Sequence, residues 1–307
     1  MTMFSKQADI YLAAIASRKR DPVKATSLAT IRSLIRAALP VLGKLKIEDI
    51  RSGELKTLAE VLDQEKYSPN TIQSVLTTVK MIIASDVDAN GDPKHPRNWN
   101  NEFIDAPPAK SKEVIPPTAD RIELALACSE SPTREFIATQ AATGCRLGEL
   151  LALNVSDFDS VRGLLRVSRT RSRHGETDTK TNAGKREVDL HPDISAILTA
   201  MLAGRDSGRL FSVTIDSVRW AYGRLEIKSH SLRHFRYTLL QKSKIHPAIH
   251  AYWIGHSVKG MAAIYGHIQD DIELRQRLVR EVGLGFSLPA HAAPQTASSR
   301  PEVSAIA

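Results

Sequence analysis

Four short stretches, far apart in the chain, carry side chains that could bind a phosphate, move a proton or attack phosphorus. They contain Arg146 in Ala-Thr-Gly-Cys-Arg-Leu-Gly-Glu, His230 and Arg233 in His-Ser-Leu-Arg-His, His256 in Ile-Gly-His-Ser, and Tyr265 in Ile-Tyr-Gly-His. Guanidinium groups offer paired donors to phosphate oxygens, and histidines exchange protons near neutral pH. A tyrosine hydroxyl can act as a nucleophile. No acidic metal cluster accompanies these stretches, so they predict phosphoryl transfer without a metal.

The order and spacing of the four stretches resemble the tyrosine recombinase family, the integrase and Xer-like enzymes that cut and rejoin DNA. The family pattern is Arg, a hairpin Lys, His-x-x-Arg, His and then Tyr, and the resemblance covers about residues 6–282. It implies a supporting acid at Glu149, for which an ordinary (i, i+3) ion pair with Arg146 is the alternative. The catalytic set that it implies is Arg146, Lys180, His230, Arg233, His256 and Tyr265.

The resemblance also implies how these residues act. Tyr265 would attack a DNA phosphodiester, giving a 3′-phosphotyrosine and a free 5′-hydroxyl. That ester retains the bond energy, so rejoining would need neither ATP nor a metal, and no other cofactor is expected. His230 would assist proton transfer and bind the phosphate, and His256 would hydrogen-bond a non-bridging oxygen. The partner would be double-stranded DNA, with four protomers on two duplexes.

The lysine is assigned by its place in a hairpin. The general acid of the family precedes a strand that resembles Val-Pro-Leu, here Val188-Asp189-Leu190. Lys180 in Thr-Lys-Thr-Asn fits this place best, and Lys185 is the alternative. The hairpin is longer than in the family pattern, and aspartate stands where proline is usual.

Charge is concentrated around the candidate site. The net charge is +8, but residues 162–186 hold eight Lys/Arg against two acids, and residues 219–244 hold seven against one. Such segments favour a nucleic-acid backbone as partner, with solvated loops and helix faces as the alternative. We expect direct DNA contacts from Arg169, Arg171, Arg173, Lys185 and Arg186.

The elements that must position these residues fall into two lobes. Helical apolar stripes and start signals at Ser52 and Ser68 predict a helical core-binding domain over 1–88, and the Pro-rich residues 89–117 predict an extended linker. A catalytic domain over 118–282 would begin with two helices. Thr118 would cap the first, Ser131-Pro132 would open the second, and Gly144 would end the second. The strands 164–167 and 186–190 would follow, joined by a long hairpin, and then more helices. The Ala/Ser/Pro-rich residues 283–307 predict disorder. The fold class is mainly α with a small antiparallel sheet.

The cysteine content and the lack of long apolar runs indicate the cellular compartment. The two cysteines form no pairing or metal pattern, which is typical of a reducing cytosol, and Cys145 is predicted to be a buried hydrophobe. The N-terminus lacks a signal-peptide run and no stretch approaches transmembrane length, so we expect no membrane partner and a cytoplasmic, nucleoid-associated protein of bacterial or phage origin. His246 and His250 have a zinc-compatible spacing but no convincing third ligand, which favours surface histidines on a DNA-facing helix.

Two alternatives remain open. A type IB topoisomerase-like enzyme would use similar residues but act as a monomer. A catalytically silent DNA-binding relative would keep the fold and lose turnover. The complete set of nucleophile and phosphate ligands favours the recombinase.

Overall fold

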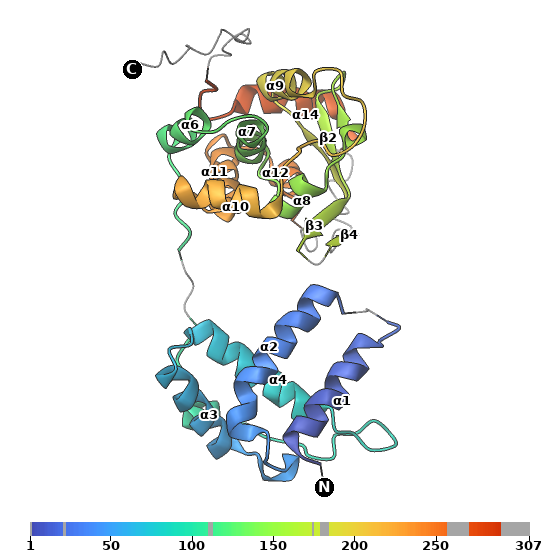
Figure 1. Cartoon of the computed structure of the whole chain (residues 1–307), viewed down its shortest axis with the longest axis vertical. Helices are drawn as coiled ribbons and strands as arrows, with labels where there is room; N and C mark the ends of the chain where they lie inside the picture. Colours follow the sequence, from blue (N-terminus) through green and yellow to red (C-terminus); the bar gives the residue numbers. More distant parts are fainter. Residues whose placement is uncertain are drawn as a thin grey trace, which may run out of the picture. The chain divides into compact units, whose positions relative to one another are not determined.

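The computed structural model describes residues 2–20, 23–109, 113–173, 175–178, 184–256 and 270–289. The chain divides into two compact units, Met1–Glu113 and Val114–Ala307 (Figure 1), and each contains its own hydrophobic core. The boundary between them falls within the stretch predicted as a linker. The mostly helical architecture with small antiparallel sheets confirms the predicted fold class.

The first unit is a helical bundle whose core is built from apolar stripes on its four long helices. The Ser-Pro-Asn signal is confirmed, because the Ser68 side chain accepts the Thr71 N–H at 3.2 Å and its helix begins at Pro69. The elements are α1 (Phe4–Ala16), α2 (Ala25–Leu42), a 3₁₀ turn (Ile47–Asp49), α3 (Ser52–Gln64) and α4 (Pro69–Ala84).

Helix α2 differs from the sequence expectation in one respect. By length and composition it could cross a membrane, with a mean hydropathy of 1.2, and it alone passes that test within the described ranges. Its inner residues Ile35, Ala38 and Leu42 are buried in the first core, and Arg32 and Arg36 lie on its exposed side. We therefore interpret α2 as an amphipathic core helix.

Part of the predicted linker belongs to the first unit. A short helix, α5 (Asn101–Ile104), lies in it, and Ile104 is buried while Trp99 packs against the same core. Arg97 donates to the Glu48 carbonyl oxygen at 2.9 Å and so ties this stretch to the 3₁₀ turn before α3. Proline punctuation led to the prediction of an extended linker here, but it does not show where the few apolar residues between the prolines pack.

The second unit surrounds α7, every residue of which from Glu135 to Thr143 is buried (Figure 1). The predicted cap at Thr118 is confirmed, as is the predicted end of α7 at Gly144, whose φ of 68° closes the helix. The helices are α6 (Ala119–Ala127), α7 (Thr133–Thr143), α8 (Leu147–Ala152), a 3₁₀ turn (Val155–Asp157), α9 (Pro192–Leu202), α10 (Ile215–Arg224), α11 (Ser229–Lys242), α12 (Pro247–Ile254) and α14 (Ile272–Val282).

Two small antiparallel sheets lie beside these helices. The predicted strands form β2 (Leu164–Val167) and β5 (Arg186–Asp189), paired in the register Leu165↔Val188, with β1 (Phe158–Asp159) on the other side of β2. The long hairpin between β2 and β5 contains a second sheet, β3 (Arg169–Ser172) with β4 (Gly175–Asp178). Neither β1 nor the β3–β4 pair was predicted, because these short polar strands lack an apolar alternation.

The chain after α14 packs on the second unit as far as residue 289. Leu284 and Phe286 are buried in the second core, and the Ser287 N–H donates to Glu123 Oε1 at 2.7 Å. These residues fall within the stretch 283–307 that composition predicted to be disordered. Their two large apolar side chains explain the difference, because burial of these side chains in the second core offsets the entropy cost of ordering the segment.

Candidate active site

Arg146 stands at the junction of two helices, with its guanidinium accessible. Gly144 ends α7 in the left-handed conformation, and a side chain there would come within 2.8 Å of Ile254 Cδ1. Arg146 then precedes α8, where its backbone N–H donates to Glu149 Oε2 at 2.9 Å and its Nη1 to Glu149 Oε1 at 2.8 Å. The Arg146 side chain is 47% exposed. Glu149 therefore holds Arg146 by main chain and side chain, a contact that fits both the supporting role and the (i, i+3) ion pair given as its alternative.

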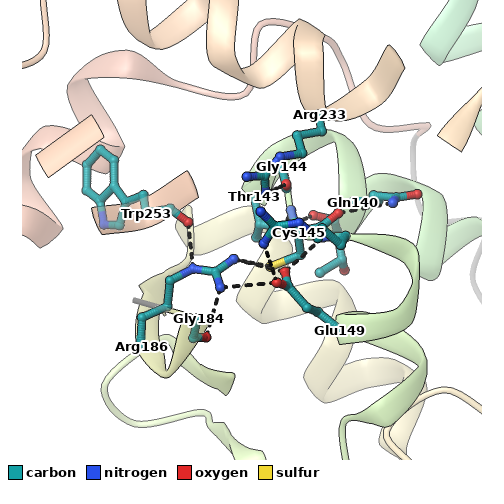
Figure 2. A network of polar contacts seen from close by, with 11 residues as sticks. Gln140, Thr143, Gly144, Cys145, Glu149, Gly184, Arg186, Arg233 and Trp253 are labelled. Atoms are coloured by element: carbon teal, nitrogen blue, oxygen red, sulfur yellow. Dashed lines mark hydrogen bonds and ion pairs between the residues drawn. The ribbon is translucent and has the colours of Figure 1, made fainter. Parts of the chain in front are cut away.

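Arg233 lies beside this junction but is buried. It projects from α11 and its Nη1 donates to the Gly144 carbonyl oxygen at 2.9 Å (Figure 2). Its Nη2 is also buried and has no hydrogen-bond partner within the described ranges. Burial, followed by the charge of Arg146, lowers the pKa of Arg233 to about 10. Two cations that repel each other, one of them with an unsatisfied donor, form a site that an anion would stabilise.

The two histidines of the predicted set belong to the same electrostatic cluster. Burial and then the charges of Arg233 and Arg146 lower the pKa of His256; for His230, burial comes first, then His234, Arg233 and Arg146. The rings of His230 and His234 lie 4.8 Å apart. Both predicted imidazoles are therefore biased toward the neutral form in the free protein, and a bound phosphate would oppose that bias. We call Arg146, His230, Arg233 and His256 the cationic cluster.

His256 is placed by the end of α12. Gly255 has a φ of 71°, and the His256 N–H donates to the Ala251 carbonyl oxygen at 3.0 Å. A side chain at position 255 would lie 2.7 Å from Nη1 of Arg186. Glycine is required here both for its conformation and because the buried Arg186 guanidinium approaches the backbone.

Arg186 supports the cationic cluster through Glu149 and the Trp253 carbonyl oxygen. The structure therefore corrects its predicted role as a DNA contact. Its side chain is 0% exposed, and its Nη2 lies 3.0 Å from Glu149 Oε2 (Figure 2). Its Nε donates to the Trp253 carbonyl oxygen at 2.9 Å. Burial alone would raise the pKa of the Glu149 carboxyl, yet Arg186 and Arg146 hold it below its ordinary value. Strand alternation could have indicated this burial, because Arg186 shares a face with Val188.

The other predicted DNA contacts lie on or next to the β3–β4 hairpin. They differ in whether their side chains already form ion pairs within the protein. Arg169 pairs with Asp157 and Glu176, Arg173 with Asp216, and Lys185 with Asp178 at 3.7 Å. Arg171 is exposed, and its side chain has no partner in the described part of the chain. The backbone of Arg171 packs against Gly148, where an added side chain would come within 2.8 Å of the Arg171 carbonyl oxygen. Arg171 is therefore held near Arg146 and is the best candidate of the five for a phosphate contact.

We expect Arg171→Ala to weaken DNA binding and to reduce the slope of log K against log salt by about 0.9, because one phosphate contact is lost. The measurement is fluorescence anisotropy with a labelled duplex over a range of salt concentrations. Arg173→Ala is the matched control, since it removes the same charge from an arginine already bound to Asp216. Equal slopes for the two variants would refute the assignment of a specific contact to Arg171.

Two predicted catalytic residues, Lys180 and Tyr265, lie outside the described residues. The prediction of two surface histidines is corrected in part, because His250 is 8% exposed and its ring packs at a tilt against Tyr237, with ring centroids 4.3 Å apart. His246 caps α12, accepting the Ala248 N–H.

Within the described ranges there is no group of three or more His, Cys, Asp and Glu side chains that could hold a metal. Cys145 is buried, as predicted.

Sequence reasoning missed Gln140, which supports the site from α7. Its Nε2 donates to the Cys145 carbonyl oxygen at 3.0 Å and to Ser229 Oγ at 3.1 Å, and its Oε1 accepts from the Tyr222 hydroxyl. Gln140 thus ties the residue before Arg146 to the residue before His230. The sequence carried no clear signal for this role, because the burial of the Gln140 amide, which requires it to be hydrogen-bonded, is visible only in the structure.

Solved structures share this fold at low sequence identity. The Tn1549 transposon integrase in complex with a circular intermediate DNA gives a TM-score of 0.71 at 18% identity, covering 86% of this chain and 95% of that chain. A lambda integrase tetramer bound to a Holliday junction gives a TM-score of 0.63 at 19% identity, covering 85% of this chain and 79% of that chain. Both likenesses show the two-unit fold.

Sequence comparisons agree with the resemblance. IntQ of Escherichia coli K12, whose name describes it as defective, is 28% identical over 207 residues, covering 61% of this chain and 50% of IntQ. A protein named as the prophage phiRv2 integrase of Mycobacterium tuberculosis H37Rv is 28% identical over 178 residues, covering 50% of this chain and 48% of that protein. This chain thus spans about half the length of these curated relatives. The phage integrase family profile matches residues 118–271, which include every member of the cationic cluster, and the chain belongs to the phage integrase family.

Proposed function

We propose that this protein is a site-specific recombinase that cuts and rejoins DNA strands through a covalent 3′-phosphotyrosine at Tyr265. The observation that carries the proposal is the cationic cluster. Arg233 has a buried donor without a partner within the described ranges, and it lies beside the exposed Arg146. Such a site favours the pentavalent phosphorane-like transition state, in which extra negative charge develops on the non-bridging oxygens.

The proposed cleavage step balances without a cofactor. Tyr265 Oη attacks phosphorus and gives its proton to the neutral imidazole of His230, the P–O5′ bond breaks, and a general acid protonates the departing 5′-oxygen. His256 and the two arginines bind the non-bridging oxygens, and His230 takes part in proton transfer. Rejoining is the same sequence in reverse, with a 5′-hydroxyl as nucleophile and Tyr265 as leaving group. Family membership and the neutral bias of both histidines support these roles.

DNA and a tetramer are the proposed partners in this reaction. Support comes from the similar lambda integrase, which is a tetramer bound to a Holliday junction in one solved structure. Exposed Arg171 next to α8 supplies a contact to the DNA backbone. We further propose a cytoplasmic location, because the substrate would be chromosomal or phage DNA.

A nicked suicide substrate tests the proposal. The protein should become covalently attached to DNA, and Tyr265→Phe should abolish the adduct while leaving DNA binding nearly unchanged, because only one oxygen is lost. Denaturing gel electrophoresis measures the adduct. Equal adduct from both proteins would exclude Tyr265 as the nucleophile.

The same substrate separates the alternatives. The similarity to IntQ, whose name calls it defective, specifically favours the catalytically silent relative as the second candidate. A silent relative would bind DNA and give no adduct under any condition. A topoisomerase-like enzyme would give the adduct as a monomer on a single duplex, whereas the proposed recombinase should join strands from two duplexes.

We predict that Lys180 protonates the 5′-oxygen. Lys180→Ala should then lose cleavage of an ordinary phosphodiester and regain much of it on a substrate with a 5′-bridging sulfur, because a thiolate leaves without a proton. Arg146→Ala should stay impaired on that substrate. Lys185→Ala is the matched control, five residues along the chain. Rescue of the Lys185 variant alone would transfer the role to Lys185, and rescue of neither would remove both from it.

A further inference from the structure

Asp189 occupies an unusual position for an acidic residue. It ends β5, the edge strand of the three-stranded sheet, and its side chain is 0% exposed. The strand Val188-Asp189-Leu190 corresponds to Val-Pro-Leu in the family that it resembles, and a proline side chain has no hydrogen-bond acceptor. A buried carboxylate is costly unless it is paired and hydrogen-bonded. Its partners therefore indicate what the aspartate does here.

Those partners come from two different helices. Asp189 Oδ2 accepts from Trp253 Nε1 on α12 at 2.7 Å and from Arg275 Nε on α14 at 2.8 Å. Its Oδ1 accepts from Arg275 Nη2 at 3.4 Å. Along the chain, α12 immediately precedes Gly255 and His256, and α14 follows residues 257–269, which include Tyr265. One carboxylate oxygen thus joins the two helices between which the proposed nucleophile lies in sequence.

Neighbouring contacts extend this connection along β5. The Glu187 N–H donates to the Tyr252 hydroxyl at 3.1 Å, and Arg275 Nη2 lies 3.3 Å from Glu187 Oε2. The Arg275 guanidinium also lies over the Tyr252 ring, 5.1 Å from its centroid. At the other end of β5, Arg186 contacts the Trp253 carbonyl oxygen and Glu149 (Figure 2). The strand therefore links both helices to the acid that holds Arg146.

We propose that Asp189 is a positioning residue that holds the end of α12 to the start of α14, and through the end of α12 places His256 beside the arginines. This inference rests on the proposed function, in which Tyr265 attacks the phosphate in line. In-line attack requires close control of geometry, and a misplacement of about 1 Å can slow a reaction about a hundredfold. An aspartate joined to both helices supplies a constraint that proline at this position would not.

The test compares Asp189→Asn with the double variant Asp189→Asn/Arg275→Met. Asparagine keeps an acceptor for Trp253 but removes the charge opposite Arg275, so the single variant should lose thermal stability and cleave the suicide substrate at least about tenfold more slowly in single turnover. The double variant also removes the Arg275 cation, which in the single variant has lost the carboxylate of Asp189 and keeps Glu187. It should regain thermal stability but stay slow in cleavage, with DNA affinity unchanged in both variants. Arg277→Met, on the same helix but exposed, is the control and should alter none of these quantities.

Hydrogen exchange gives a readout that does not depend on activity. Amides at the end of α12 and the start of α14 should exchange faster in the double variant than in wild type, while those of α7 should not change. Recovery of cleavage together with stability, or unchanged exchange in α12 and α14, would overturn the role of Asp189. If wild-type protein forms no adduct at all, the proposed function fails, and the exchange result still decides whether Asp189 holds the two helices.

Discussion

Replacement of Arg233 by alanine is expected to slow DNA cleavage by about a hundred- to a thousandfold, the usual cost of removing a donor aimed at transition-state charge. The affinity for the same duplex should change far less, because the buried guanidinium offers little to a DNA backbone outside the site. The reason lies in its Nη2 beside Arg146, which has no hydrogen-bond partner among the described residues and which an anionic oxygen would satisfy. Single-turnover cleavage of the suicide substrate and anisotropy with the intact duplex measure the two quantities.

Arg146→Ala is the companion variant, because the Arg146 side chain is 47% exposed and its loss should leave the fold intact. Like Arg233→Ala, it should lose far more cleavage rate than DNA affinity. Thermal unfolding of both proteins separates a loss of chemistry from a loss of folding. Unchanged cleavage together with weakened binding would place both arginines on the DNA backbone instead of at the scissile phosphate.

Replacement of Arg186 by methionine is expected to lower the free energy of unfolding by about 3–5 kcal/mol, because it leaves the buried Glu149 carboxylate without its main cation. Methionine keeps much of the apolar volume, so the effect reports the charge. Urea unfolding at neutral pH measures it. The loss should shrink in acid: the pKa of Glu149 is lowered in the folded protein, so the stabilisation by Arg186 exists above the unfolded pKa and disappears as pH falls through the folded one.

Arg166→Met is the matched surface control. Arg166 pairs with Asp159 at 2.8 Å, but its side chain is 46% exposed, and such pairs contribute about 0–1 kcal/mol. A similar small loss in the Arg186 variant would show that Glu149 finds another partner, and would contradict the assignment of Arg186 as its principal support.

Local signals predicted helix boundaries in both units. Ser68, Thr118 and Gly144 each act within one turn of backbone, and each stands where the sequence placed it. The order of the four stretches predicted a shared site, and the three stretches that the structure describes lie close together. Arg233 donates to the carbonyl oxygen of Gly144, two residues before Arg146, and the charges of Arg233 and Arg146 both lower the pKa of His256. The period of a strand or helix and the geometry of a cap depend on near neighbours, so they can be inferred from sequence alone.

Charge density did not predict which charged side chains are buried. Arg171 and Arg186 belong to the same basic segment, yet one is exposed and the other is enclosed by Glu149 and the Trp253 carbonyl oxygen. Their partners lie far away in sequence, so charge density alone could not separate a DNA contact from an internal support. Phe286 was missed for a related reason, because a polar stretch conceals one or two apolar residues that find a distant core.

Peptide mapping of the covalent adduct is the most direct test of the central claim, that Tyr265 becomes joined to DNA. After reaction with the suicide substrate, nuclease would trim the DNA and trypsin would release residues 260–275, in which Tyr265 is the sole tyrosine and there is no serine, threonine or cysteine. Mass spectrometry should find a nucleotide 3′-phosphate on this peptide, with fragment ions that place it on Tyr265. A nucleotide on any other residue, or covalent adduct formation that leaves this peptide unmodified, would contradict the proposed mechanism.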